Sequence, residues 1–147
     1  MESLVGKIFI EKNIIFKRTG NEKCRQVDHV YSRPALIIAE SSDYIYYLKL
    51  SSRYGCTTTL ADMKYSYKGE KHSSYVGYDQ IFRKPICFIN PVNEIYDSKL
   101  LEILLSLKIY NEKIDEDEFY LELKDIISDL IREYSLKFDK NSKKLKL

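Results

Sequence analysis

The stretch that decides the fold is Arg33-Pro-Ala-Leu-Ile-Ile-Ala-Glu40, followed by the polar turn Ser41-Ser-Asp43 and by Tyr44-Ile-Tyr-Tyr-Leu-Lys-Leu-Ser-Ser52. Two apolar runs rich in branched and aromatic residues, separated by a short polar turn, predict a β-hairpin. In a hairpin the start of the first strand lies beside the end of the second, so one end of the sheet gathers polar groups from both. Those groups are Arg33, Lys49, Ser51 and Ser52.

The apolar pattern before residue 92 predicts a β-rich core. Residues 35–39 are almost continuously apolar, as expected for a central strand buried on both faces. Residues 51–74 are polar and predict a long loop with one short helical turn near 60–64. Shorter extended segments are predicted at 7–10, 14–16, 74–78, 79–83 and 85–89, the last of them as a further buried strand.

The remainder of the chain predicts helices. Asp97 can cap a first helix that runs to about Asn111, and residues 115–118 resemble the capping box of a second. Apolar residues at helical spacing continue to Tyr134, so this second helix is expected to end within 134–138, before a lysine-rich tail.

The chain has 147 residues, 44% of them hydrophobic and 31% charged, which is typical of one domain with a real core. We therefore predict a single α+β domain over 1–147. Its β-rich part, 1–92, is expected to form a small, strongly curved antiparallel sheet, an SH3-like partial barrel. Helices in 93–138 should cover that sheet, and a basic tail, 139–147, should follow.

No membrane or secretion signal is visible in the sequence. No apolar run approaches the ~20 residues needed to span a bilayer, and residues 1–7 lack the basic and apolar segments of a signal peptide. This pattern predicts a cytoplasmic protein.

The metal-binding and redox residues are few. Cys24, Cys56 and Cys87 are widely spaced without a CxxC arrangement, and His29 and His72 lie far apart. A disulfide framework is not expected in a cytoplasmic chain of this size. Glycine-rich phosphate loops and paired catalytic carboxylates are absent as well. We expect no metal and no cofactor.

The charge is distributed unevenly along the chain. Residues 1–90 contain 14 Lys/Arg and 9 Asp/Glu, whereas residues 91–136 contain 5 and 12. Nine of the 13 tyrosines also lie before residue 90. Aromatics interleaved with cations can stack unpaired bases while the cations follow the phosphates, so RNA is the expected partner. A solvated acidic helix surface would explain the second half equally well. The candidate RNA-binding residues are Lys17, Arg18, Arg25, Tyr31, Tyr47, Arg53, Tyr54, Lys64, Lys68, His72, Arg83 and Lys84.

Strand alternation places Lys49 and Ser51 on one face and their leucine neighbours on the other. Arg33 and Lys49 could hold a phosphodiester and stabilise charge that builds on its oxygens, with Ser51 and Ser52 adding hydrogen bonds. A surface lysine beside turn-forming serines is the alternative interpretation of the same pattern.

RNA cleavage also needs a group that removes the 2′-hydroxyl proton. His29, just upstream of Arg33, is the favoured general base or acid because histidine titrates near neutral pH. His72 is the second candidate, and the sequence does not choose cleanly between the two.

These residues resemble the core of the MazF/PemK-like endoribonuclease toxins, in which an Arg-Pro-x-Leu-Ile-Ile strand precedes a strand ending in Thr or Ser at the active site. Arg33-Pro-Ala-Leu-Ile-Ile38 and Leu50-Ser-Ser52 carry the likeness. Residues 78–91 look more like the type III branch, which includes the ToxN, AbiQ, CptN and TenpN toxins, and the whole chain is most similar to the CptN type. ToxN-like relatives have Lys in place of Arg33 and Thr-Ser in place of Ser51-Ser52, so these positions match in chemistry and not in identity.

The resemblance implies a metal-independent endoribonuclease that cleaves single-stranded RNA to 2′,3′-cyclic phosphate and 5′-hydroxyl ends. It also implies restraint by a small, pseudoknot-like repeat RNA in a closed toxin–RNA assembly, with no protein antitoxin and a role in phage defence. Two rival interpretations remain open. One is a type II MazF-like toxin held by a protein antitoxin, and the other is a non-catalytic RNA-binding module with the same barrel.

Overall fold

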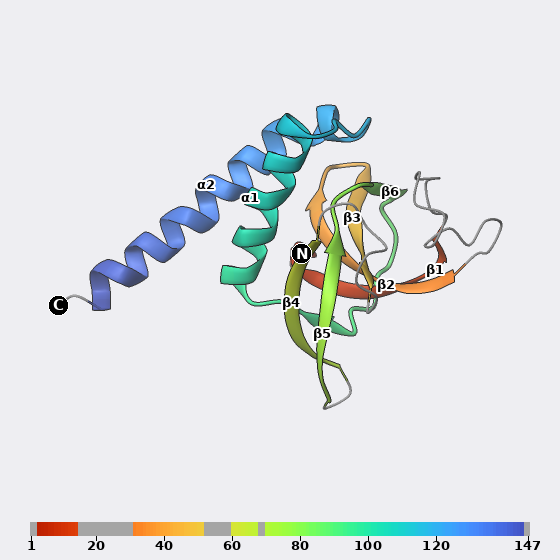
Figure 1. Cartoon of the computed structure of the whole chain (residues 1–147), viewed down its shortest axis with the longest axis horizontal. Coiled ribbons are helices and arrows are strands. Elements are labelled where there is room, and N and C mark those ends of the chain that lie inside the picture. Colours follow the sequence, from red (N-terminus) through yellow and green to blue (C-terminus); the bar gives the residue numbers. More distant parts are fainter. Residues whose placement is uncertain (1–2, 15–30, 52–59, 68–69, 146–147) are drawn as a thin grey trace.

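The computed structural model describes the backbone of residues 3–14, 31–51, 60–67 and 70–145, and the side chains of 3–12, 33–50 and 76–139. Over these residues, seven strands are followed by two helices, whose arrangement is drawn in Figure 1. The elements are β1 (Lys7–Ile14), β2 (Tyr31–Glu40), β3 (Tyr44–Ser51), β4 (Leu60–Tyr67), β5 (Glu70–Gly77), β6 (Phe82–Pro85), β7 (Asn93–Glu94), α1 (Asp97–Lys113) and α2 (Tyr120–Leu145).

The predicted hairpin is confirmed, since β2 and β3 pair antiparallel with Ala35 opposite Lys49 and Ile37 opposite Tyr47. The register shifts between Ile37 and Ala39, so that Ala39 lies opposite Tyr46. Such a bulge bends the strand and puts two consecutive residues on one side. The turn is closed by the Ser41 amide, which donates to the Tyr44 carbonyl at 2.8 Å.

All described strand pairs are antiparallel, and the order across the sheet is β4-β5-β3-β2-β1-β7. Strand β3 also pairs with β6: its first half, Tyr44–Tyr47, pairs with β6, and its end, Leu50 and Ser51, pairs with β5. This order is open, since β4 and β7 form its two ends, and the sheet does not have the strong curvature that the sequence led us to expect. The two helices lie side by side against one side of the sheet, and α2 continues well past α1 (Figure 1). The predicted α+β class, with an antiparallel sheet and C-terminal helices, is confirmed.

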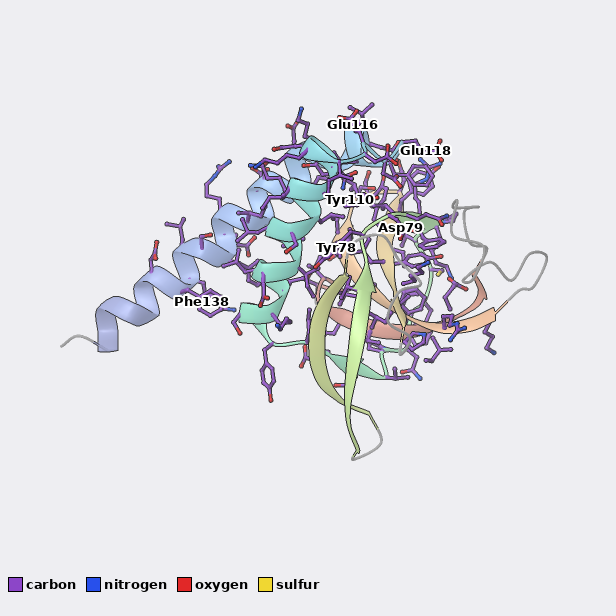
Figure 2. The ribbon with its side chains drawn as sticks, in the orientation of Figure 1. Tyr78, Asp79, Tyr110, Glu116, Glu118 and Phe138 are labelled. Atoms are coloured by element: carbon purple, nitrogen blue, oxygen red, sulfur yellow. The ribbon has the colours of Figure 1, made fainter. Side chains whose placement is uncertain are left out.

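The sheet has two faces with different cover. One face, which we call the helix face, buries Leu36, Leu48 and Leu50 against Leu104 and Leu107 of α1 and residues of α2. Tyr78 and Tyr110 lie where the sheet meets α1 (Figure 2), and both are nearly fully buried. The opposite face, which we call the open face, has a smaller apolar cluster that no helical residue joins: Phe9, Ala35, Ile37, Ile45, Tyr47 and Phe82, with Leu4 and Ile89 at its border.

Two predictions for the β-rich part of the chain were wrong. The polar residues 11–13, expected as a break between two strands, belong to one strand, β1, which continues to Ile14, and Glu11 pairs there with Arg33 of β2. Residues 15–16 of the second expected strand lie outside the described residues. The expected loop with a helical turn near 60–64 is largely the hairpin β4–β5. Polar residues suit such a pair because an antiparallel sheet does not need to be buried on both sides.

The predicted buried strand at 85–89 was also wrong. Strand β6 ends at Pro85, opposite Tyr44, because β3 itself begins there and offers no further partner. Beyond that point Ile86 is 49% exposed and Phe88 is 91% exposed.

The helices begin and end differently from the prediction. Helix α1 has Tyr96 at its N-cap with no side-chain hydrogen bond, so Asp97 is its first residue and does not cap it. In place of a capping box, the buried Asp117 carboxylate accepts from the amides of Phe119 at 2.9 Å and Ile81 at 3.0 Å. Helix α2 continues to Leu145, because lysine is a good helix former and needs no apolar partner.

Over the described residues, neither helix carries an apolar stretch of the length that crossing a bilayer requires.

Candidate functional site

The candidate site lies on the open face, where β1, β2 and β3 run side by side. Glu11 of β1 is the direct cross-strand partner of Arg33. In the next row of the same face, Ala35 pairs with Phe9 on one side and with Lys49 on the other. Direct cross-strand neighbours have Cβ atoms about 5 Å apart and diagonal neighbours about 7–8 Å, so Arg33 lies between Glu11, its direct neighbour, and Lys49, its diagonal neighbour.

The hairpin register also brings Ser51 to this place. Ala35 pairs with Lys49, and continuing that register toward the end of the hairpin sets Arg33 across from Ser51. On its other edge β3 pairs with β5, where Ser51 meets Tyr75. The backbone of Ser51 therefore lies near Arg33 and Lys49 at this end of the hairpin.

A polar cluster extends this group across the open face. The Lys84 ammonium donates to Glu11 Oε2 at 2.8 Å, and the Tyr47 hydroxyl donates to the same oxygen at 3.3 Å. The three residues come from β6, β1 and β3, and their contacts connect these strands across the open face. Glu11 is only 9% exposed. We call Glu11, Tyr47 and Lys84 the open-face cluster.

The Tyr47 ring is held by aromatic neighbours. It stacks on Phe82 with ring centroids 5.4 Å apart and meets the edge of Phe9 at 5.2 Å. The ring is 5% exposed, so the prediction that Tyr47 stacks a base does not fit its packing. Burial, followed by the charge and hydrogen bond of Glu11, raises the pKa of the Tyr47 hydroxyl well above 10.0. That hydroxyl remains a hydrogen-bond donor at neutral pH.

Arg83, another predicted RNA-binding residue, lies on the helix face. Its guanidinium pairs with Glu122 of α2 at 2.8 Å, and the Tyr46 hydroxyl donates to the same carboxylate at 2.9 Å. The guanidinium also lies over the rings of Tyr44, at 4.1 Å, and Phe119, at 4.6 Å. We call Tyr46, Arg83 and Glu122 the helix-face cluster. Its contacts attach α2 to the sheet, which is a structural role.

Several predicted site residues lie outside the described residues: Lys17, Arg18, Arg25, His29, Ser52, Arg53, Tyr54 and Lys68. Only the backbone is described for Tyr31, Ser51, Lys64 and His72. His72 stands opposite Tyr65 in the β4–β5 hairpin, three residues beyond Tyr75, which is the partner of Ser51. That separation is about 10 Å along the strand.

Sequence reasoning missed Glu11, because residues 11–13 looked like a polar break between two strands. A signal was present, since Phe9 and Glu11 have the same strand parity and a lone carboxylate facing Arg33 is a favourable cross-strand pair. The pairing of β1 with β2 was needed to see it.

Within the described part of the chain, no three His, Cys, Asp or Glu side chains stand close enough to hold a metal ion. The site that the geometry offers there is a cationic, hydrogen-bonding surface suited to an anion. A scan against protein-family models finds no match for the chain, and a search of curated proteins finds no relative.

Proposed function

We propose that this protein is an endoribonuclease whose active site lies on the open face at the end of the β2–β3 hairpin. The observation that carries the proposal is the register that groups Arg33, Lys49 and Ser51, with Glu11 as the neighbour of Arg33. Two cations with a hydroxyl at a strand end suit a phosphodiester, because charged hydrogen bonds to phosphate are the strong ones.

In the proposed reaction the 2′-oxygen of RNA attacks the neighbouring phosphorus as its proton is removed. The P–O5′ bond breaks, the 5′-oxygen takes a proton, and a 2′,3′-cyclic phosphate remains, so no water or metal enters the step. Arg33 and Lys49 stabilise the charge on the phosphorane oxygens, and Ser51 and Ser52 orient the phosphate. His29 is the favoured proton-transfer residue. His72, whose backbone lies in β5 three residues from the partner of Ser51, is the second candidate.

The biological part of the proposal follows from the resemblance to MazF/PemK-like toxins. The protein acts as the cytoplasmic toxin of a type III system in phage defence and is inhibited by a small repeat RNA that occupies the same cationic face. The antiparallel sheet followed by two C-terminal helices is what supports the likeness in fold. The open order of its strands departs from a closed barrel.

The central experiment compares Arg33→Ala and Ser51→Ala with a matched control, Arg132→Ala. Arg132 is exposed on α2 and forms an ion pair with Asp129 of the same helix. Loss of a transition-state donor lowers kcat by about 10²-fold or more, so both site variants should lose RNA cleavage and cellular toxicity while the control keeps them. If both site variants, correctly folded, cleave RNA as well as the wild type, the active site is wrong.

Copurification separates the type III and type II interpretations. The toxin expressed with its native flanking sequence should retain nucleic acid that is sensitive to ribonuclease, whereas a small acidic protein in its place would support type II. RNA affinity should fall by roughly 0.7 log units per tenfold increase in salt for each single-strand phosphate neutralised. Affinity that is insensitive to salt would contradict the cationic face as the binding surface.

A further inference from the structure

The open-face cluster is built from more contacts than a surface ion pair needs. One carboxylate oxygen, Glu11 Oε2, accepts from both Lys84 and Tyr47, and the Lys84 ammonium lies 5.6 Å from the centre of the Phe9 ring. A nearly buried carboxylate is costly unless it is paired, so Glu11 holds its two donors firmly in place. The pair fixes the Lys84 ammonium, which would otherwise sample many rotamers.

The place of this cluster gives the fixed ammonium a use. Glu11 is the cross-strand partner of Arg33, and Lys49 stands in the next row of the same face. Arg33, Lys49 and Lys84 with Glu11 carry a net charge of +2. A phosphodiester carries one negative charge and a phosphorane two, so this set matches the transition state better than the bound substrate.

We propose that Glu11 is a positioning residue of the RNA-cleaving site: with Tyr47 it holds the Lys84 ammonium where this cation joins Arg33 and Lys49 at the scissile phosphate. This inference rests on the proposed endoribonuclease function and deepens it. Lys84 thereby becomes a third phosphate ligand. Glu11 acts through Lys84 and does not touch the RNA.

The helix-face cluster supplies a matched control, because it also joins a carboxylate, a tyrosine hydroxyl and a cation. Glu11→Gln and Glu122→Gln each remove one charge and keep the shape of the side chain. Both carboxylates accept a tyrosine hydroxyl and a cation of β6, but Glu122 lies on the helix face. A general effect of net charge should appear in both variants, and a positioning effect only in Glu11→Gln.

The experiment measures kcat and KM on a fluorogenic single-stranded RNA, and Kd for a 2′-O-methyl analogue that cannot be cleaved. For Glu11→Gln we expect kcat to fall about 10²-fold, because a small displacement of a catalytic group has that effect. The Kd should stay the same or decrease, because a negative charge near the phosphates is removed. Glu122→Gln should stay within about threefold of the wild type in both quantities, a range below the effect of losing one site contact.

Two further results make the test decisive. Lys84→Met should lose activity as Glu11→Gln does, and the double variant should be no worse than either single one, because residues that act as a unit are not additive. If Glu11→Gln does not fold, Tyr47→Phe takes its place, since it keeps the ring packing and removes only the hydroxyl. For Tyr47→Phe we expect kcat to fall by less than in Glu11→Gln, while Kd again stays the same or decreases.

The outcomes separate this inference from the function beneath it. If the wild type cleaves RNA and folded Glu11→Gln cleaves it equally well, the inference is wrong and the endoribonuclease stands. An equal loss in Glu122→Gln would also overturn the inference. If the wild type neither cleaves RNA nor binds the analogue, the proposed function fails and the positioning role fails with it.

Discussion

The tyrosines and the cations of the open-face cluster and the helix-face cluster are neighbouring residues of the same two strands, β3 and β6. Tyr46 and Tyr47 are consecutive in β3, and they pair with Arg83 and Phe82 of β6. Strand alternation then sends Tyr46 and Arg83 to the helix face, and Tyr47 and Lys84 to the open face. Each tyrosine and each cation meets one carboxylate, Glu122 on the helix face and Glu11 on the open face.

The difference between the clusters lies in what covers them. On the helix face, Arg83 is enclosed between Tyr44 and Phe119, and its partner Glu122 belongs to α2, so the contacts join two layers of the fold. On the open face no helical residue joins the cluster, and Arg33 is the cross-strand neighbour of Glu11. The same chemistry therefore attaches α2 to the sheet on one side, and on the other side it lies beside Arg33 of the candidate site.

The largest expected effect tests the alternation that separates the two faces. Leu48 is fully buried on the helix face, so Leu48→Ala should lower the free energy of unfolding by about 2–5 kcal/mol. Lys49→Ala, one residue later on the open face, should cost less than about 1 kcal/mol. Urea denaturation of the two variants measures the difference. Equal losses would show that residues 48 and 49 do not alternate between a core and an accessible surface.

The alternation at residues 48–51 could be predicted from the sequence, because Leu48, Lys49 and Leu50 alternate in polarity and the turn before Tyr44 sets the hairpin. The same reasoning predicted that Arg33, Lys49 and Ser51 lie at one end of the sheet. The local pattern was sufficient for both, since hairpin register depends on residues close in sequence.

The open-face cluster could not be predicted from the sequence, because it depends on long-range pairing. Lys84 meets Glu11 across 73 positions of the chain, and only the pairing of β6 with β3 brings it near. Arg83 and Lys84 are adjacent and both positively charged, so the charge pattern alone does not distinguish them. Their strand parity, fixed by the start of β6 at Phe82, assigns them to opposite faces.

The second expected effect compares single and double loss within the open-face cluster. Lys84→Met leaves the nearly buried Glu11 carboxylate without its ammonium, which should cost about 2 kcal/mol of stability. Adding Glu11→Gln should recover part of that loss, because the uncompensated charge is then gone. Denaturation of the three variants measures the coupling. Purely additive losses would contradict the pairing of these two side chains.

A smaller effect is expected from the two tyrosine hydroxyls. Tyr46→Phe and Tyr47→Phe each remove a hydrogen bond to a carboxylate while keeping the ring, at a cost of about 1 kcal/mol. The two variants should therefore resemble each other in thermal unfolding. Only Tyr47→Phe should also lower RNA cleavage. A loss of cleavage in Tyr46→Phe would place the helix-face cluster in the site and remove the contrast between the faces.

The smallest effect is the acid sensitivity of the helix-face cluster. Hydrogen bonds from Tyr46 and then from Arg83 lower the pKa of the Glu122 carboxyl below its ordinary value of 4.5. A carboxyl whose pKa is lowered by folding contributes stability that is complete above 4.5 and is lost as the pH falls through the lowered value. Glu122→Gln should therefore be less stable than the wild type at neutral pH, and this deficit should shrink on acidification from about pH 5 to about pH 3. Urea midpoints across that range measure it, with Glu118→Gln as the control for removing one carboxylate. A deficit that is constant with pH would show that the Glu122 carboxylate is not held by Tyr46 and Arg83.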